Sequence, residues 1–125
     1  QIDGFRVRYQ HFLIETERIS EDRLDRHPEG PLDAFEVGRG EVVCFGHTHR
    51  RVWTYDGSRG CLNPGATGFV GPEGATLCQL VVKENAVWTS WHPLDCNALP
   101  VISAFKARRV PGWEHAADYM FAVHA

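Results

Sequence analysis

The chain has 125 residues, 43% of them hydrophobic and 23% charged, which is the composition of an ordinary globular domain. Its net charge of -3 gives no general attraction to nucleic acid or to anionic membranes. No apolar run approaches the roughly 20 residues that a membrane-spanning helix needs. We therefore expect at most one domain, with neither nucleic acid nor membrane as a partner.

The first residues predict a turn and then a strand. The chain opens with Gln1, and residues 2–4 are typical of a hairpin turn whose first strand is absent, so we expect a fragment or a processed product. Residues 5–11 alternate apolar and polar side chains, which predicts a half-buried strand. His11 falls on the apolar side of this alternation. It is therefore predicted to point inward, as a core residue or as a ligand.

A short helix and a buried strand are predicted next. Mixed charges fill much of residues 13–26 and indicate a solvated surface. Leu32, Phe35 and Val37 are spaced to line one face of a short helix. The β-branched and aromatic residues at 41–45 then predict a buried strand, which Gly46 ends.

Gly46-His47-Thr48-His49 is the main candidate for chemistry. Two histidines two positions apart in an extended segment project to the same side, so both imidazoles can face one point. Imidazole is the commonest protein ligand for transition metals. The alternative interpretation is a turn that carries two solvated histidines.

A hairpin and a loop follow this motif. Residues 50–55 and 60–62 are predicted strands, and Asp56-Gly57 between them is typical of a type I′ turn. Pro64 restricts Asn63 to extended backbone, and the following glycines permit close packing. We expect Asn63 to be structural and to orient a histidine from behind the site.

The remaining segments are predicted as a second hairpin and two helices. Residues 75–83 and 86–91 form strands around Glu84-Asn85, and a helical stripe follows within residues 94–109. Pro111 opens a second short helix. The residues expected in the core are Leu77, Leu80, Val81, Val87, Trp88, Leu99, Ile102, Phe105, Trp113, Ala117, Met120 and Phe121.

The four cysteines Cys44, Cys61, Cys78 and Cys96 never occur as Cys-x-x-Cys. Three of them lie in apolar strand contexts, where a free thiol behaves as a small hydrophobic group. We expect reduced thiols and a cytoplasmic protein. A zinc cluster of Cys44, His47, His49 and Cys61 is the alternative.

Gly-His-Thr-His after a hydrophobic strand, followed by a short hairpin and by Asn-Pro-Gly-Ala-Thr-Gly at residues 63–68, resembles the C-terminal half of calcineurin-like metallophosphoesterases. Among these it is most similar to the small bacterial phosphodiesterases, and the resemblance covers most of the chain. It implies an α/β fold, the C-terminal portion of an α/β/β/α sandwich with mixed or antiparallel strands and two C-terminal helices. Residues 1–125 would then be the C-terminal part of one domain.

The resemblance also implies a metal-dependent hydrolase. Two divalent ions, manganese first and iron, zinc or nickel as alternatives, would activate a bridging water against a small phosphodiester or phosphomonoester. His11 and His47 would share one ion and His49 would bind the other. The family motifs Gly-Asp-x-x-Asp and Gly-Asn-His are missing from this chain, and Asp25-Arg26-His27 stands in a charged segment and not, as the family's Asp-x-His does, after a hydrophobic strand. We therefore expect little hydrolysis by the chain alone, with the full-length parent as the enzyme.

A second hypothesis is a non-catalytic scaffold, because a relative in the retromer coat keeps this fold as a protein-binding platform. The missing carboxylates favour it, and the intact His47 and His49 oppose it. A half sandwich would also expose sheet edges, so homo-oligomers are expected.

Overall fold

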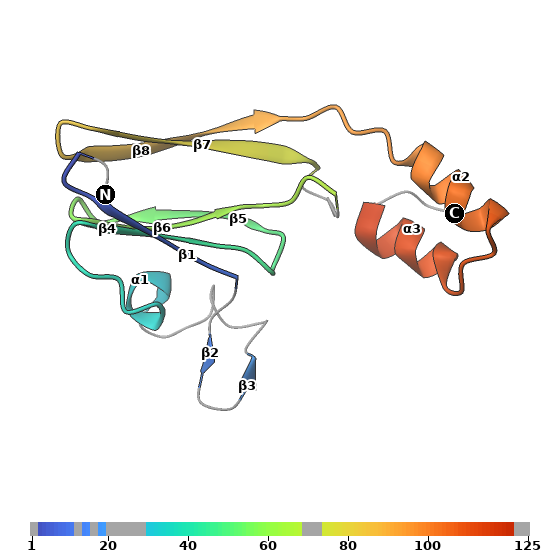
Figure 1. The fold of residues 1–125 in the computed structure, drawn as a ribbon, viewed down its shortest axis with the longest axis horizontal. Coiled ribbons are helices and arrows are strands. Elements are labelled where there is room, and N and C mark those ends of the chain that lie inside the picture. The colour runs from blue at the N-terminus through green and yellow to red at the C-terminus, as the bar shows by residue number, and fades with distance from the viewer. Residues whose placement is uncertain (1–2, 12–13, 16–17, 20–29, 69–73, 122–125) are drawn as a thin grey trace.

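A computed structural model of the chain describes residues 3–11, 14–15, 18–19, 30–68 and 74–121, and the side chains among them apart from those of residues 14–15, 18–19 and 120–121. These residues form a mixed α/β structure (Figure 1). In chain order the elements are β1 (Arg6–Gln10), β2 (Ile14–Glu15), β3 (Arg18–Ile19), α1 (Gly30–Ala34), β4 (Glu41–Phe45), β5 (Arg51–Tyr55), β6 (Arg59–Pro64), β7 (Thr76–Lys83), β8 (Ala86–Pro93), α2 (Leu99–Ala107) and α3 (Trp113–Phe121). The predicted charged surface at residues 13–26 lies outside the described side chains.

The main sheet has the strand order β1-β4-β6-β5. β1, β4 and β6 are parallel to one another, and β5 runs antiparallel to β6. β2 and β3 pair only with each other, as do β7 and β8. Since parallel strands end at the same edge, the segments that follow β1, β4 and β6 meet there.

Side chains alternate between the two faces of this sheet and form two separate cores. On one face, Val43, Phe45 and Cys61 pack with residues of α1 and its C-terminal extension. Leu32, Phe35 and Val37 are all buried there, as predicted. On the other face, the β7–β8 hairpin covers a core that includes Val42 and Phe5. The result is three layers, with α1 below the sheet and the hairpin above it in Figure 1.

The hairpin turn is the one that the sequence predicts, but part of its predicted core is wrong. Glu84 and Asn85 both have positive φ, 52° and 61°, as a type I′ turn requires. Val87 is buried, whereas Leu77 is 55% exposed and Trp88 46% exposed. The register pairs Val82 with Val87 and Val81 with Trp88, so residues 81 and 88 share the outer face.

The turn between β5 and β6 differs from the predicted type. Asp56 and Arg59 are bonded through Asp56 N–H and Arg59 C=O, so Gly57 and Ser58 are the central residues. Of these two only Gly57 has positive φ, at 93°, which excludes type I′. Asp56 instead accepts hydrogen bonds from the backbone N–H groups of Ser58 and Arg59.

His11 does not point inward, which corrects its prediction. β1 ends at Gln10, and His11 lies just beyond it and is exposed. Tyr9, on the predicted inner face, is 78% exposed. His11 and Tyr9 are exposed because β1 is an edge strand. The core under the hairpin buries Phe5, just before β1 begins, but does not extend to Tyr9.

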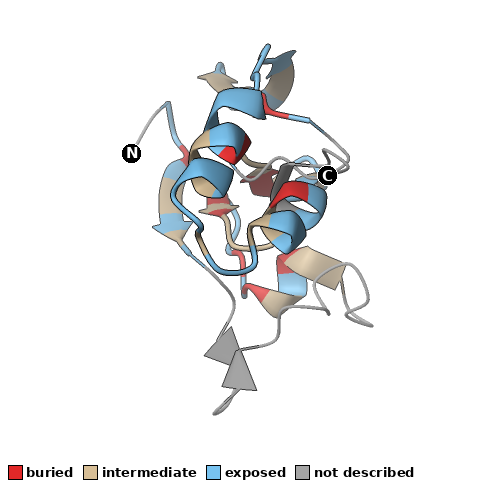
Figure 2. Ribbon diagram, turned by 90° about the vertical axis from the view of Figure 1, so that its right-hand side faces the viewer, coloured by how far each residue is buried: buried red, intermediate tan, exposed pale blue. Residues whose placement is uncertain are grey.

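The two C-terminal helices are present as predicted and pack on each other beside one end of the sheets (Figures 1 and 2). Ile102 and Ala117 are buried, but Leu99 is exposed, which contradicts its assignment to the core. The predicted core side chains of Met120 and Phe121 lie outside the described part. None of the described helices is both long enough and apolar enough to cross a membrane.

Candidate functional site

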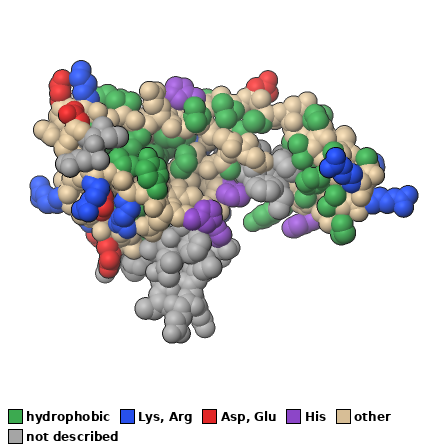
Figure 3. Space-filling model, in the orientation of Figure 1, with side chains coloured by type: hydrophobic (Ala, Val, Ile, Leu, Met, Phe, Trp, Pro, Cys, Tyr) green, Lys and Arg blue, Asp and Glu red, His purple; other side chains and the backbone are tan. Residues whose placement is uncertain are grey.

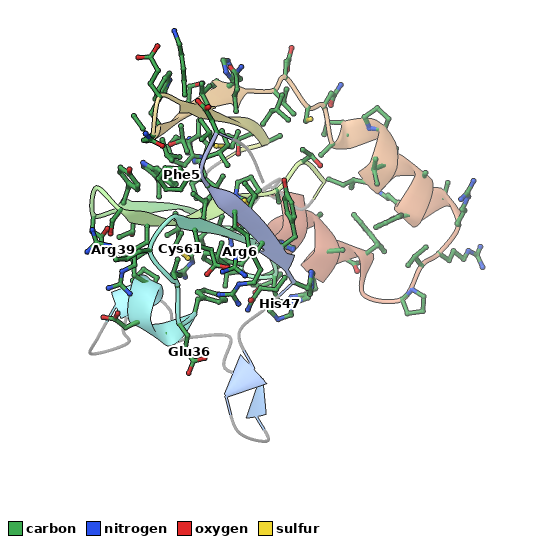
Figure 4. The ribbon with its side chains drawn as sticks, turned by 60° about the vertical axis from the view of Figure 1, so that its left-hand side comes forward. Phe5, Arg6, Glu36, Arg39, His47 and Cys61 are labelled. Atoms are coloured by element: carbon green, nitrogen blue, oxygen red, sulfur yellow. The ribbon has the colours of Figure 1, made fainter. Side chains whose placement is uncertain are left out.

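Two of the three predicted histidines meet at the carboxyl edge of the sheet. Nδ1 of His47 lies 3.2 Å from Nε2 of His11, and the two rings stand nearly edge to face with centroids 5.1 Å apart. Figure 4 shows His47 at the arrowhead end of β1, and in Figure 3 histidine atoms lie side by side near the middle of the visible face, with other histidine atoms well apart from them. Ligands of open α/β sheets are commonly bound at this edge.

The parallel pairing of β1 and β4 produces this meeting. Gln10 is in register with Phe45, and one residue further on the Gly46 N–H donates a hydrogen bond of 3.0 Å to the His11 carbonyl. The backbone thus fixes His11 and Gly46 next to each other. His47 follows directly.

His47 is at the centre of a γ-turn, and the segment is not extended as predicted. The Thr48 N–H donates to the Gly46 carbonyl over 2.8 Å, and His47 has a φ of 70°. His49 also has positive φ, at 57°. Strand alternation therefore does not place the two imidazoles on one side. The sharp turn also lies at His47 and not at Gly46, where an added Cβ would meet only ordinary contacts.

Asn63 holds this turn from below. Its side chain is fully buried, and its Nδ2 donates to the Gly46 carbonyl at 3.1 Å and to Thr48 Oγ1 at 3.0 Å. Its Oδ1 accepts a hydrogen bond from the Gly65 N–H at 3.0 Å. Asn63 therefore fixes the backbone on both sides of His47, and through it the position of the imidazole.

The loop after Asn63 is locked onto β7. Thr76 is buried and its hydroxyl donates to the Pro64 carbonyl at 2.9 Å. Gly65 has a φ of 82°, and an added Cβ would lie 2.9 Å from Thr76 Oγ1. Only glycine fits this position without displacement. The hairpin layer thus supports the same loop that carries Asn63.

His11 and His47 fit a shared metal ion by their spacing. Two nitrogens each about 2.0–2.1 Å from one ion lie about 2.8–3.4 Å apart for angles from 90° to tetrahedral. The observed separation of 3.2 Å falls within this interval. The same distance also suits a hydrogen bond between neutral imidazoles, with the tautomers deciding which ring donates.

The full predicted ligand set is not assembled within the described residues. Across residues 3–11, 30–68 and 74–119, no three or more His, Cys, Asp or Glu side chains form a group that could hold a metal. His49 is exposed at the end of the motif and does not complete such a group with His11 and His47. The described site is therefore a histidine pair.

The alternative zinc cluster conflicts with the fold. Cys61 faces the α1 layer and Cys44 faces the hairpin, so the two thiols point to opposite sides of the sheet. Burial, helped by the neighbouring Cys78, raises the pKa of Cys44 to about 11, and burial raises that of Cys61 to about 12. Because Cys44 and Cys61 face opposite sides of the sheet, the two thiols do not converge on one ion in this fold. All four cysteines are free, as predicted.

A cavity of about 570 Å³ opens beside the histidine pair, between the sheet and the hairpin. His11 and Gly46 belong to its lining, together with Tyr9 and Gln10 at the end of β1. Its walls come from both layers, with Cys44 and Leu62 from the sheet and Cys78 and Leu80 from the hairpin.

Sequence reasoning missed Thr48 and Cys78 as parts of the site. Thr48 lies inside the histidine motif, but its hydrogen bond with Asn63 depends on the γ-turn at His47, which the residue types do not predict. To place Cys78 at the site, one must know which residues of β7 face the sheet. The turn at Glu84-Asn85 fixes the register of the hairpin and was the available signal. No protein-family model and no curated protein matches this chain.

Proposed function

We propose that this chain belongs to a metal-dependent phosphoester hydrolase of the calcineurin-like metallophosphoesterase type, as the C-terminal part of its α/β/β/α sandwich. The observation that carries the proposal is the His11–His47 pair, with nitrogens 3.2 Å apart at the carboxyl ends of parallel strands. The layering of α1, sheet and hairpin supports it, since it matches three of the four layers. The motif at residues 46–49 supports it further.

In such an enzyme, two divalent ions supply a nucleophilic water at neutral pH and neutralise charge on the phosphoryl oxygens. His11 and His47 would hold one ion through Nε2 and Nδ1, the atoms that face each other here. Asn63 keeps His47 in place by holding Gly46 and Thr48. His49 would contribute to holding the second ion. Manganese is the preferred metal, with iron, zinc or nickel as alternatives.

No carboxylate of the described residues completes the site, so the bridging carboxylate and the remaining ligands would come from other residues of the enzyme. Two imidazoles alone bind an ion weakly and leave no general acid for the leaving group. The isolated chain is therefore expected to bind metal without appreciable hydrolysis. The substrate of the complete enzyme would be a small phosphodiester or phosphomonoester.

Metal titration of the chain tests the first part of the proposal. We expect the affinity for Zn²⁺ or Mn²⁺ to fall at least tenfold in His11→Ala and in His47→Ala. His115→Ala is the matched control, because His115 is exposed on α3 and stacks on Tyr119 away from the pair. Equal binding by wild type, His11→Ala and His47→Ala would contradict the shared site.

Hydrolysis by the complete enzyme tests the second part. Mn²⁺-dependent cleavage of bis(p-nitrophenyl) phosphate should be abolished by His47→Ala and by His49→Ala. Only His47→Ala should also reduce the affinity for the ion that His11 and His47 would share. Persistent turnover in both variants would overturn the hydrolase assignment.

A protein-binding scaffold is the second candidate, and one observation favours it. Leu77 and Trp88 lie on the same outer face of the hairpin, separated by the Gln79–Ser90 pair, and are 55% and 46% exposed. Large apolar side chains on an open sheet face are common at protein interfaces. Under this hypothesis Leu77→Ser with Trp88→Ser removes partner binding, while His47→Ala leaves it intact.

A further inference from the structure

The cavity next to the histidine pair has a composition that the proposed hydrolase does not by itself require. We propose that it binds the organic substituent of the phosphoester, and that this substituent is apolar, either aryl or alkyl. The inference rests on the proposed function for the position of the phosphate. That the substituent is apolar is inferred from the residues that line the cavity alone.

The walls favour an apolar group. None of the described residues that line the cavity is Asp, Glu, Lys or Arg, and its inner walls are formed by Leu62, Leu80, Cys44 and Cys78. A sugar or a second phosphate placed there would lose its water without gaining charged or hydroxyl partners from these walls. An apolar group gains free energy from the same burial.

The volume is sufficient for a group the size of an aromatic ring system or an alkyl chain. A volume of about 570 Å³ is within the range of small-molecule sites. Tyr9 contributes to the lining and is 78% exposed, so the face of its ring is available for stacking at the entrance.

Position connects the cavity to the chemistry. His11 both lines the cavity and faces Nδ1 of His47. A phosphoryl group held at the histidine pair therefore has its ester oxygen at the entrance of the cavity. The substituent on that oxygen enters between the sheet and the hairpin.

A pair of phosphonates tests the inference on the 125-residue chain. (1-Naphthylmethyl)phosphonate and methylphosphonate share the phosphoryl oxygens and differ in the organic group. By titration calorimetry with Zn²⁺ present, we expect the naphthyl compound to bind at least tenfold tighter. Equal affinities would overturn the proposal.

Two variants test whether the preference for the naphthyl compound arises in the cavity. Cys78→Phe places a ring in the cavity wall and is expected to reduce the naphthyl preference at least tenfold. Gln79→Phe adds the same ring one position along β7, on the outer face, and is expected to leave the preference unchanged. Circular dichroism confirms that both variants fold. Loss of preference in Gln79→Phe, or its full retention in Cys78→Phe, would contradict the assignment.

His47→Ala separates this inference from the proposed function. If both hold, the variant weakens both phosphonates by the same factor and leaves their ratio unchanged. If the hydrolase proposal fails while the cavity is correct, His47→Ala changes neither affinity and the naphthyl preference persists. The neutral probe 1-naphthalenemethanol gives a measurement without phosphate or metal, and failure of Cys78→Phe to reduce its binding would overturn the cavity assignment.

Discussion

At the scale of single residues, His47 combines an unfavourable backbone conformation with the position of a proposed metal ligand. A γ-turn with positive φ is uncommon, and a non-glycine residue in it costs of the order of 1 kcal/mol or more. Here the turn is maintained by the two hydrogen bonds that Asn63 donates to Gly46 and Thr48. Strain that is held in place by a buried side chain is characteristic of sites in which one group must be oriented.

Replacing His47 by glycine or by alanine separates strain from chemistry. Both variants lack the imidazole and are expected to lose the proposed metal binding. His47→Gly accepts a φ of 70° without a Cβ, so it should be more stable than His47→Ala by about 1 kcal/mol in urea unfolding. Equal stability of the two variants would show that the γ-turn is not retained once the imidazole is gone.

Asn63 is expected to affect stability and metal affinity together. Asn63→Ala removes the buried donor for Gly46 and Thr48, and should cost about 2–3 kcal/mol in the free energy of unfolding. Metal affinity should fall about 10–100-fold, because His47 loses its support. Asn63→Asp keeps the acceptor for Gly65 but places an oxygen against the Gly46 carbonyl, and should be at least as damaging. Normal metal affinity in both variants would exclude the orienting role.

At the scale of elements, the sequence predicted most strands and helices but not every face. The run of β-branched and aromatic residues at 41–45 was sufficient to predict β4, and the turn at Glu84-Asn85 was sufficient to predict the β7–β8 hairpin. The sequence did not predict which face of that hairpin is buried, since Leu77 and Trp88 are apolar and yet face outward. Hydrophobicity alone does not reveal which of two apolar faces a neighbouring layer covers. In the structure, the pairing of β1 with β4 brings His11 next to His47. The γ-turn at His47 depends on the hydrogen bonds that the buried Asn63 donates, and local residue types do not predict these.

Strand parity in the hairpin can be tested directly. Val87→Ala removes two methyl groups from the core between hairpin and sheet and should cost about 2 kcal/mol. Trp88→Ala, one position further on, removes a much larger side chain from the exposed face and should cost less. Chemical denaturation of both variants gives the comparison. A larger loss for Trp88→Ala would mean that the outer face is covered in solution.

At the scale of the whole molecule, the ends of the sheet serve different purposes. The histidines lie at the carboxyl edge, whereas Glu41 is buried where β4 begins. Its carboxylate accepts hydrogen bonds from the Gly38 N–H at 3.0 Å and from Arg8 Nε at 3.3 Å. Burial would raise the pKa of Glu41, but these two partners outweigh it and the pKa lies below its ordinary value. A charged group thus joins β1, β4 and the loop after α1 away from the candidate site.

This carboxylate makes stability depend on pH. A depressed pKa means that the stabilisation is complete above the ordinary value of 4.5 and is lost as pH falls through the folded pKa. At pH 7, Glu41→Gln should lose about 1–3 kcal/mol relative to wild type, and the difference should shrink in acid. Glu84→Gln, at an exposed ion pair with Lys83, is the control and should show little change at any pH. A gap that persists undiminished in strong acid would contradict the ionised role of Glu41.

The order of the sheet also has a kinetic consequence. β7 and β8 are joined by a two-residue turn, whereas Arg8 reaches Glu41 across a separation of 33 residues. Pairings between distant segments close large loops and form late, while local hairpins form early. β1 should therefore dock after the rest of the sheet and be the first strand to detach. In hydrogen exchange, the amides of β1 should lose protection before those of β4 and β6, so His11 would be present at the site only for as long as the last-formed strand remains in place.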